Sequence, residues 1–167
     1  GQYIAFLDSD DLWKPEKLEK QIQFMQTNQL AISCTGYSRI SEDLAKEGHY
    51  IAVPHPITYE TLLVNNVMGC LTVMIDQSVT GRLSMQETKH EDYLLWLKIL
   101  RNGFKGGGLN QDLARYRIVK NSRSANKFEM IKYRWKILTE YEGISSLISA
   151  KYLFLYGLTS LKKYSRF

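Results

Sequence analysis

An apolar run that ends in an acidic turn is the feature that most restricts how this chain folds. Residues 3–7 read Tyr-Ile-Ala-Phe-Leu and are followed at once by Asp8-Ser9-Asp10-Asp11. A short, continuous apolar run is typical of a strand buried on both faces of a parallel sheet. Carboxylates directly after such a strand lie at the edge where α/β sheets bind ligands. We therefore expect an α/β domain with a central strand at 3–7 and a binding site at 8–11.

Strand and helix patterns alternate along most of the chain. The expected strands are 3–7, 31–40, 70–75 and 113–118, and the expected helices are 15–27, 58–63, 91–102, 126–141 and 144–163. The polar stretch 41–56 is expected to be a loop, and Gly106-Gly107-Gly108 a flexible turn, because no phosphate-loop lysine follows it. The alternation predicts a mostly parallel sheet with flanking helices, followed by a C-terminal helical pair hinged at Gly143.

Length and cysteine content narrow the class of protein. A chain of 167 residues is long enough for one domain with a substantial core. Cys34 and Cys70 lie far apart without a companion ligand, so neither a zinc site nor a disulfide framework is expected, and a reducing cytoplasm fits best. His49 and His55 also lack ligand spacing. The first residues do not have the pattern of a signal peptide.

The charge is unevenly distributed along the chain. Residues 1–114 carry 10 Lys and Arg against 14 Asp and Glu, whereas residues 115–167 carry 12 against 3. The basic part suits an anionic partner, although a solvated basic helix pair is an equal alternative. Residues 144–163 are too polar for a confident membrane span, so we expect them to lie on the inner membrane surface or to form a homodimer. Nucleic acid is not expected, because no binding motif is present.

The acidic turn itself suggests a metal. Hard cations such as Mg²⁺ or Mn²⁺ take carboxylate ligands together with substrate phosphates. Asp8, Asp10 and Asp11 provide three carboxylates, whereas capping the following helix would need one. We expect this turn to hold a metal, with a purely structural turn as the alternative.

A second acidic pair opens the predicted helix at 91–102. A carboxylate there can act as a general base on an acceptor hydroxyl. On the residues alone, however, Thr88 and Glu91 form a capping-box pattern, which favours a structural role for both acids. Trp96 follows Asp92 by one helical turn, where its ring could lie against a sugar or pack in the core.

The stretch 3–18 resembles the DxD region of family 2 glycosyltransferases of the GT-A fold, and His90 to Leu97 is similar to the family's ED motif. The resemblance implies an inverting transfer of a sugar from a nucleotide-sugar donor to a saccharide or lipid-linked acceptor, in bacterial surface polysaccharide synthesis. It places Asp8 near the donor nucleoside and Asp10, with Asp11, near the metal and diphosphate. It makes Asp92 the catalytic base and leaves Glu91 mainly to the cap.

A basic segment resembles the part of the family that covers the donor. Arg117, Lys120 and Arg123 are its donor-binding candidates, since Arg and Lys bind diphosphate, although each could equally be an exposed loop cation. Val119 stands where the family has a histidine. Another cation must then replace that histidine if it helps to hold the metal or diphosphate.

The resemblance covers residues 1–125 and implies the C-terminal part of a GT-A-like (Rossmann-like) catalytic domain, with 126–167 as a helical extension. Family members begin with another nucleotide-binding strand and helix, so we expect such a portion upstream and weak or absent turnover by residues 1–167 alone. Two alternatives stay open. One is a non-catalytic binding or assembly module. The other is a haloacid-dehalogenase-like phosphatase, which Asp11-Leu12 disfavours because that family has Thr or Val after its second Asp.

Overall fold

The structure is a computed structural model that describes residues 1–85, 87–88, 90–118 and 127–164. The chain divides into two compact units. The first consists of Gly1–Tyr59 and Val67–Lys120, and the second of Glu60–Asn66 and Asn121–Phe167.

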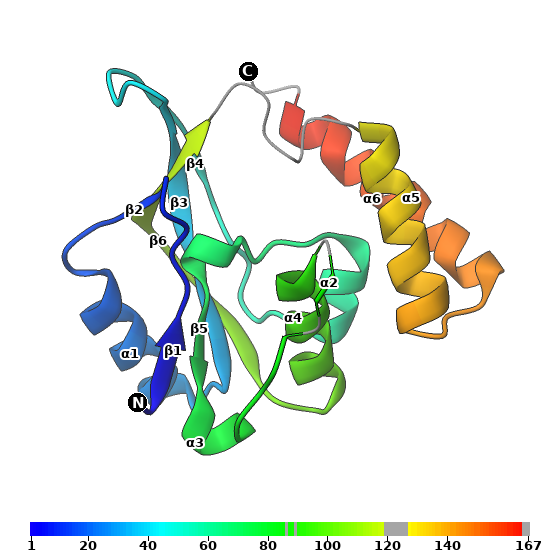
Figure 1. Cartoon of the computed structure of the whole chain (residues 1–167), viewed down its shortest axis with the longest axis horizontal. Helices are drawn as coiled ribbons and strands as arrows, with labels where there is room; N and C mark the ends of the chain where they lie inside the picture. Colours follow the sequence, from blue (N-terminus) through cyan, green and yellow to red (C-terminus); the bar gives the residue numbers. More distant parts are fainter. Residues whose placement is uncertain (86, 89, 119–126, 165–167) are drawn as a thin grey trace. The chain divides into compact units, whose positions relative to one another are not determined.

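The first unit is built on one mixed sheet (Figure 1). Its strands are β1 (Tyr3–Ala5), β2 (Leu12–Trp13), β3 (Ile32–Ser41), β4 (Glu47–Ile51), β5 (Met74–Asp76) and β6 (Gly106–Ile118). Their order is β1-β5-β3-β6-β2, with β4 paired to β3. The expected α/β class is confirmed, but among the described residues only β3 and β6 pair in parallel. The expectation of a mostly parallel sheet with a central first strand was wrong, because an apolar run fits a buried strand of either direction and β1 pairs with β5 alone.

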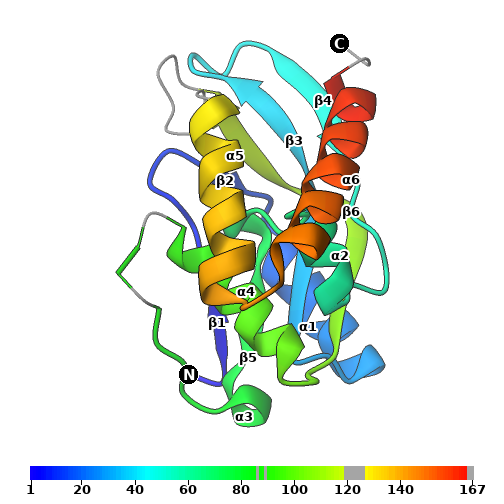
Figure 2. The ribbon, with the colours of Figure 1, turned by 90° about the vertical axis from the view of Figure 1, so that its right-hand side faces the viewer.

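Two helices of this unit cover opposite faces of the sheet, α1 (Lys17–Asn28) and α4 (Glu91–Arg101) (Figures 1 and 2). Both confirm predictions made from helical periodicity. The first buries residues four apart, and the second buries most of its length, including Trp96. The remaining short elements are η1 (Cys70–Thr72), a single 3₁₀ turn, and α3 (Gln77–Thr80).

Two parts of the sheet differ from the sequence prediction. The stretch 41–56 contains β4, an exposed polar strand whose residues do not alternate, so the prediction of a loop was wrong. The glycine triplet begins β6 and is not a flexible turn. A Cβ atom on Gly108 would lie 2.2 Å from the carbonyl oxygen of Pro54, and one on Gly106 would lie 2.8 Å from that of Ile57. The glycines therefore let the 54–57 segment cross β6 closely.

The second unit is helical. It contains α2 (Tyr59–Val64) from Glu60 onward, α5 (Lys127–Lys136), the π-helical turn η2 (Ile137–Tyr141) and α6 (Ser146–Tyr164). Figure 2 shows α5 and α6 side by side. Buried Arg134 joins the three helices, because its guanidinium donates to the Leu63 carbonyl at 2.6 Å and lies 4.5 Å from the Tyr156 ring. Gly143 adopts a φ of 65°, which confirms the predicted hinge.

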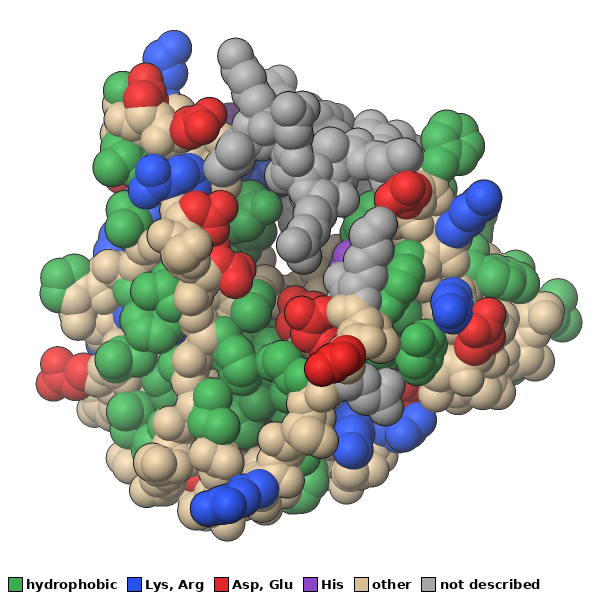
Figure 3. Space-filling model, viewed as in Figure 1, with side chains coloured by type: hydrophobic (Ala, Val, Ile, Leu, Met, Phe, Trp, Pro, Cys, Tyr) green, Lys and Arg blue, Asp and Glu red, His purple; other side chains and the backbone are tan. Residues whose placement is uncertain are grey.

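The helices of the second unit leave apolar side chains in solvent. Phe128 on α5 is 82% exposed, and Leu147 and Phe154 on α6 are 84% and 67% exposed. Figure 3 shows hydrophobic side chains at the surface over these helices. Within the described residues, no helix combines the length and the apolar content needed to cross a bilayer.

Candidate functional site

The acidic turn follows β1 and is closed by a backbone hydrogen bond from the Asp11 amide to the Asp8 carbonyl at 3.1 Å. Asp8 and Asp10 are exposed, whereas Asp11 is 5% exposed. The chain then enters β2, which pairs with β6. Two carboxylates of the acidic run therefore face solvent, and the third turns into the protein.

Asp11 joins the turn to β6. Its Oδ1 accepts a hydrogen bond from the Arg117 backbone amide at 2.9 Å, and the Arg117 side chain donates from Nε to the Asp10 carbonyl at 2.7 Å. Burial raises the pKa of Asp11 to about 6, with a further contribution from the charges of Asp10 and Asp8, against the lowering effect of the Arg117 hydrogen bond. Asp11 therefore has a structural role, since it anchors the acidic turn to β6.

The acidic turn offers few ligands for a metal ion. No cluster of three or more His, Cys, Asp or Glu side chains is arranged to hold a metal ion in the part of the chain that the structure describes. Magnesium commonly needs only one or two carboxylates when substrate phosphates supply other ligands. The exposed carboxylate of Asp10 meets that requirement, and Asp11 has already committed one oxygen to Arg117. Asp10 therefore remains the better candidate ligand of the two.

The second acidic element is the first turn of α4. Its N-cap is His90, whose side chain makes no capping hydrogen bond, and the buried Oγ1 of Thr88 has no hydrogen-bond partner among the described residues. The predicted capping box between Thr88 and Glu91 was therefore wrong. Burial raises the pKa of Asp92, and the negative charges of Glu91 and Asp8 add to the effect. Asp92 is thus a half-buried carboxylate with more basic character than an ordinary aspartate.

Trp96 lies one turn further along α4 and is 0% exposed. Its ring packs edge-on against Phe6 of the segment before the acidic turn, at 5.2 Å between ring centroids. In this structure Trp96 is a core residue. Its buried Nε1 has no hydrogen-bond partner among the described residues.

The two acidic elements converge on η1. The pKa of the Cys70 thiol is raised to about 12, first by burial and then by the negative charges of Asp8, Asp92, Glu91 and Asp11. Residues more than eighty positions apart therefore act on one thiol. The sequence did not indicate Cys70, because only the fold brings it between the two acidic elements.

The basic candidates are only partly described. Arg117 reaches the acidic turn, and its Nη1 also donates to the Glu42 carbonyl at 3.3 Å. Lys120 and Arg123, as well as Val119 at the position of the family histidine, lie outside the described residues.

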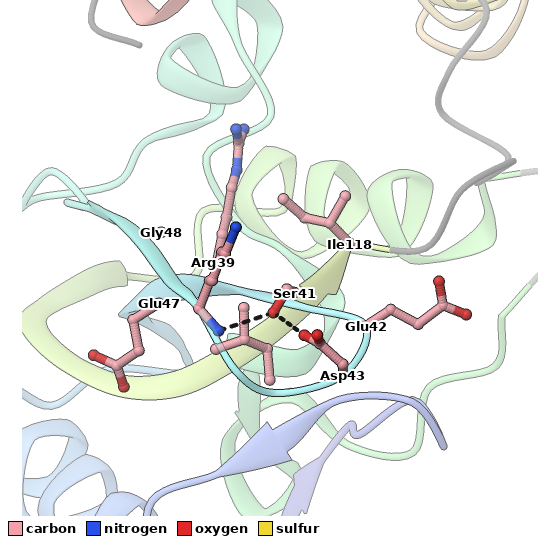
Figure 4. A pocket seen from close by; sticks show the side chains of 9 residues that line it. Arg39, Ser41, Glu42, Asp43, Glu47, Gly48 and Ile118 are labelled. Atoms are coloured by element: carbon pink, nitrogen blue, oxygen red, sulfur yellow. Dashed lines mark hydrogen bonds between the residues drawn. The ribbon is translucent and has the colours of Figure 1, made fainter.

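A separate groove lies at the β3–β4 hairpin beside the end of β6, with a volume of about 790 Å³ (Figure 4). Ser41 holds the hairpin turn, because its hydroxyl donates to Asp43 at 2.5 Å and accepts from the Lys46 amide at 3.0 Å. The groove is lined by both basic and acidic side chains, including Arg39 and Glu47. The groove contains none of the candidate residues from the acidic turn or α4.

Comparison with solved structures supports the class of fold. The chain matches the crystal structure of S. aureus TarS 1–349 in complex with UDP-GlcNAc with a TM-score of 0.57 over 93% of this chain and 47% of that one. The sequence identity is 12%, so this likeness concerns the fold alone. The architecture is that of a GT-A-like glycosyltransferase domain.

Comparison of sequences identifies the family. The profile of "Glycosyl transferase family 2" matches residues 1–84. The chain is 41% identical over 164 residues to the putative teichuronic acid biosynthesis glycosyltransferase TuaG of Bacillus subtilis, covering 98% of this chain and 65% of that protein. It is 36% identical to the Escherichia coli UDP-Glc:alpha-D-GlcNAc-diphosphoundecaprenol beta-1,3-glucosyltransferase WfgD, covering 99% of this chain and 64% of that protein.

The chain therefore belongs to glycosyl transferase family 2. It spans about 65% of the length of these curated relatives.

Proposed function

We propose that the protein transfers a sugar, with inversion, from a nucleoside-diphosphate sugar to a hydroxyl of a lipid-linked saccharide in bacterial polysaccharide synthesis. Residues 1–125 would form the catalytic part and residues 126–167 a helical extension. The observation that carries the proposal is the convergence of Asp8 and Asp92, whose charges act on each other and on Cys70. A transferase needs a donor-binding end and a base at one place, and these two elements supply both.

The residues divide between donor and acceptor. Asp8 and Asp10 would face the nucleoside and diphosphate of the donor, and Arg117 would hold the turn that carries them through its bond to the Asp10 carbonyl. Asp92 would remove the acceptor proton as the hydroxyl attacks the anomeric carbon, and its raised pKa suits that role near neutral pH. A Mg²⁺ or Mn²⁺ ion held by Asp10 would neutralise the departing diphosphate. Lys120 and Arg123 keep their proposed diphosphate contacts, and Trp96 would support the acceptor side from the core.

A lipid-linked acceptor is supported by the named substrate of WfgD, a diphosphoundecaprenol. Because the chain belongs to glycosyl transferase family 2, the phosphatase alternative is no longer needed. A non-catalytic binding module is the competing hypothesis, and an assay for product formation separates the two.

The test is an assay of the full-length protein with UDP-glucose and other nucleotide sugars, a diphosphoundecaprenol-linked GlcNAc acceptor, and Mg²⁺ or Mn²⁺. We expect a glycosylated lipid product that disappears when the metal is removed with EDTA. Donor binding without product would instead support the non-catalytic module. Transfer that is unaffected by EDTA would remove the metal from the proposal.

Membrane contact is proposed for the helical extension. Exposed apolar side chains recur at helical spacing on one face of α6 at Leu147, Phe154 and Leu158, and such a face can lie in a membrane interface. Lys151 lies on the same face, from which its long side chain can reach anionic headgroups. We expect the chain to float with vesicles containing anionic lipid, and Phe154→Ser to weaken flotation several-fold. A concentration-dependent dimer without flotation would show that these helices pair with a second copy instead.

A further inference from the structure

Two side chains that follow the acidic turn, one on β2 and one on α1, donate hydrogen bonds to consecutive carbonyl groups of η1. Trp13 donates from Nε1 to the Leu71 carbonyl at 2.7 Å, and Gln21 donates from Nε2 to the Thr72 carbonyl at 2.9 Å. The same turn carries Cys70, on which the charges of Asp8 and Asp92 converge. The position of η1 beside the acidic turn therefore depends on these two hydrogen bonds.

Lys17 lies between the two donors and contacts both. Its ammonium group lies 4.4 Å from the centre of the Trp13 ring and donates to Gln21 Oε1 at 2.7 Å. Because a lysine can only donate, it fixes the amide oxygen of Gln21 toward itself. The amide nitrogen is thereby directed to Thr72 and to the Ser33 hydroxyl at 3.0 Å. Lys17 thus orients both side chains, Trp13 and Gln21, that bind η1.

Global stability does not explain a lysine at this position. Lys17 is 0% exposed, and its hydrogen-bond partner Gln21 is a neutral amide. Burying an ammonium group is costly, and an apolar side chain of similar volume is often neutral or stabilising in such a place. Burial lowers the pKa of Lys17 to about 8, with a smaller opposing effect from Cys34, so the amine is still mainly charged at neutral pH. A methionine would fill the same volume but would lack the contacts that the ammonium group makes with Trp13 and Gln21.

We propose that Lys17 is a positioning residue that fixes Trp13 and Gln21, holds η1 against the acidic turn, and so sets the spacing between Asp8 and Asp92. The catalytic consequence rests on the proposed function, but the positioning itself does not.

The test uses Cys70 as a local reporter. Cys70 is half-buried on η1, whereas Cys34 is 0% exposed, so alkylation at the two sites can be separated by peptide mass spectrometry. In Lys17→Met we expect Cys70 to be alkylated about tenfold faster, because η1 opens locally more often. Little change in melting temperature is expected. The matched control is Lys20→Met on the same helix, where the lysine is exposed and pairs only loosely with Glu16 at 3.8 Å. It should label like the parent chain.

A folded Lys17→Met chain that labels at the parent rate would overturn the proposal. If that variant does not fold, Trp13→Phe, which removes the indole N–H donor to Leu71 but keeps an aromatic ring at this position, must show the same faster labelling. A parent rate in Trp13→Phe would be equally decisive against the proposal. In the full-length protein, Lys17→Met should lower kcat about tenfold with little change in the donor KM, because the reacting groups are misplaced. Faster labelling without any transfer by the parent would uphold the positioning and defeat the proposed function.

Discussion

Replacing Asp92 by asparagine is expected to lower the rate of sugar transfer by about 10²–10⁴-fold, the usual contribution of a general base. Asparagine keeps the shape of the side chain at the start of α4 but cannot take up the acceptor proton. Because the reactive form of Asp92 is the carboxylate, the rate should also fall as the pH drops through its raised pKa. Steady-state kinetics of the full-length protein, with kcat and KM measured separately over a range of pH, would check both expectations.

The neighbouring acid provides the matched control. Glu91 lies in the same helical turn, and its charge also acts on Cys70. We expect Glu91→Gln to keep kcat within about threefold of the parent, since removing a partly exposed charge has a small effect. If Glu91→Gln were as damaging as Asp92→Asn, or if Asp92→Asn kept most of the activity, the base would have to be assigned elsewhere.

Replacing Asp11 by asparagine is expected to stabilise the protein at neutral pH. The pKa of Asp11 is about 6 in the folded chain, above its ordinary value of 3.8, so the folded state binds more protons than the unfolded state between these values. The free energy of unfolding therefore loses a contribution as the pH rises from about 4 to about 6. A shift of this size corresponds to about 3 kcal/mol. Asparagine retains an oxygen that can accept from the Arg117 amide without carrying the buried charge.

Chemical denaturation in EDTA at pH 4.5 and 7.5 would measure this effect without interference from a metal. Asp11→Asn should gain stability over the parent by about 2 kcal/mol more at pH 7.5 than at pH 4.5, because the unfolded parent is already partly ionised at pH 4.5. Asp10→Asn, which changes an exposed neighbour, should show no comparable pH dependence. A stability difference between Asp11→Asn and the parent that does not change with pH would show that Asp11 is not held as a high-pKa buried carboxyl.

Such a gain would show that the ionised Asp11 side chain lowers the free energy of unfolding of the parent protein. A buried carboxylate that weakens the fold at working pH is common at functional sites, where the local charge is needed for another purpose. In this chain the charge of Asp11 also acts on Cys70, in the middle of the two acidic elements. The acidic run thus combines an anchor to β6 at Asp11 with two exposed carboxylates, which we propose face the donor.

The elements with strong periodicity could be predicted from sequence, and those decided by long-range contacts could not. Helices α1 and α4 were both expected from their sequence patterns; the buried residues of α1 recur at helical spacing, whereas α4 is buried over most of its length. Strand β4 was missed because pairing with β3, rather than its own pattern, makes it a strand. The glycine triplet was misassigned because glycine is needed there to make room for residues 54–57, which lie about fifty positions earlier in the chain.

The candidate site shows the same division. Asp8, Asp10 and Asp92 were proposed from motifs and stay proposals, now with a common location. Three aspartates within four residues have no pattern that tells which one turns inward, so the anchoring of Asp11 by Arg117 was not predictable. Lys17 was equally hidden, because lysine is almost always exposed and its indirect partner Thr72 lies far along the chain.

The pKa of Asp92, measured by NMR titration of its carboxyl carbon, tests most directly the claim that the acidic turn and the start of α4 form one site. In the parent chain this pKa should lie above the ordinary range for aspartate, and in Asp8→Asn it should fall, because one of the charges that raise it has been removed. Asp43→Asn, which changes an exposed acid of the β3–β4 hairpin, should leave it unchanged. An ordinary pKa for Asp92, or one that does not respond to Asp8→Asn, would contradict the claim.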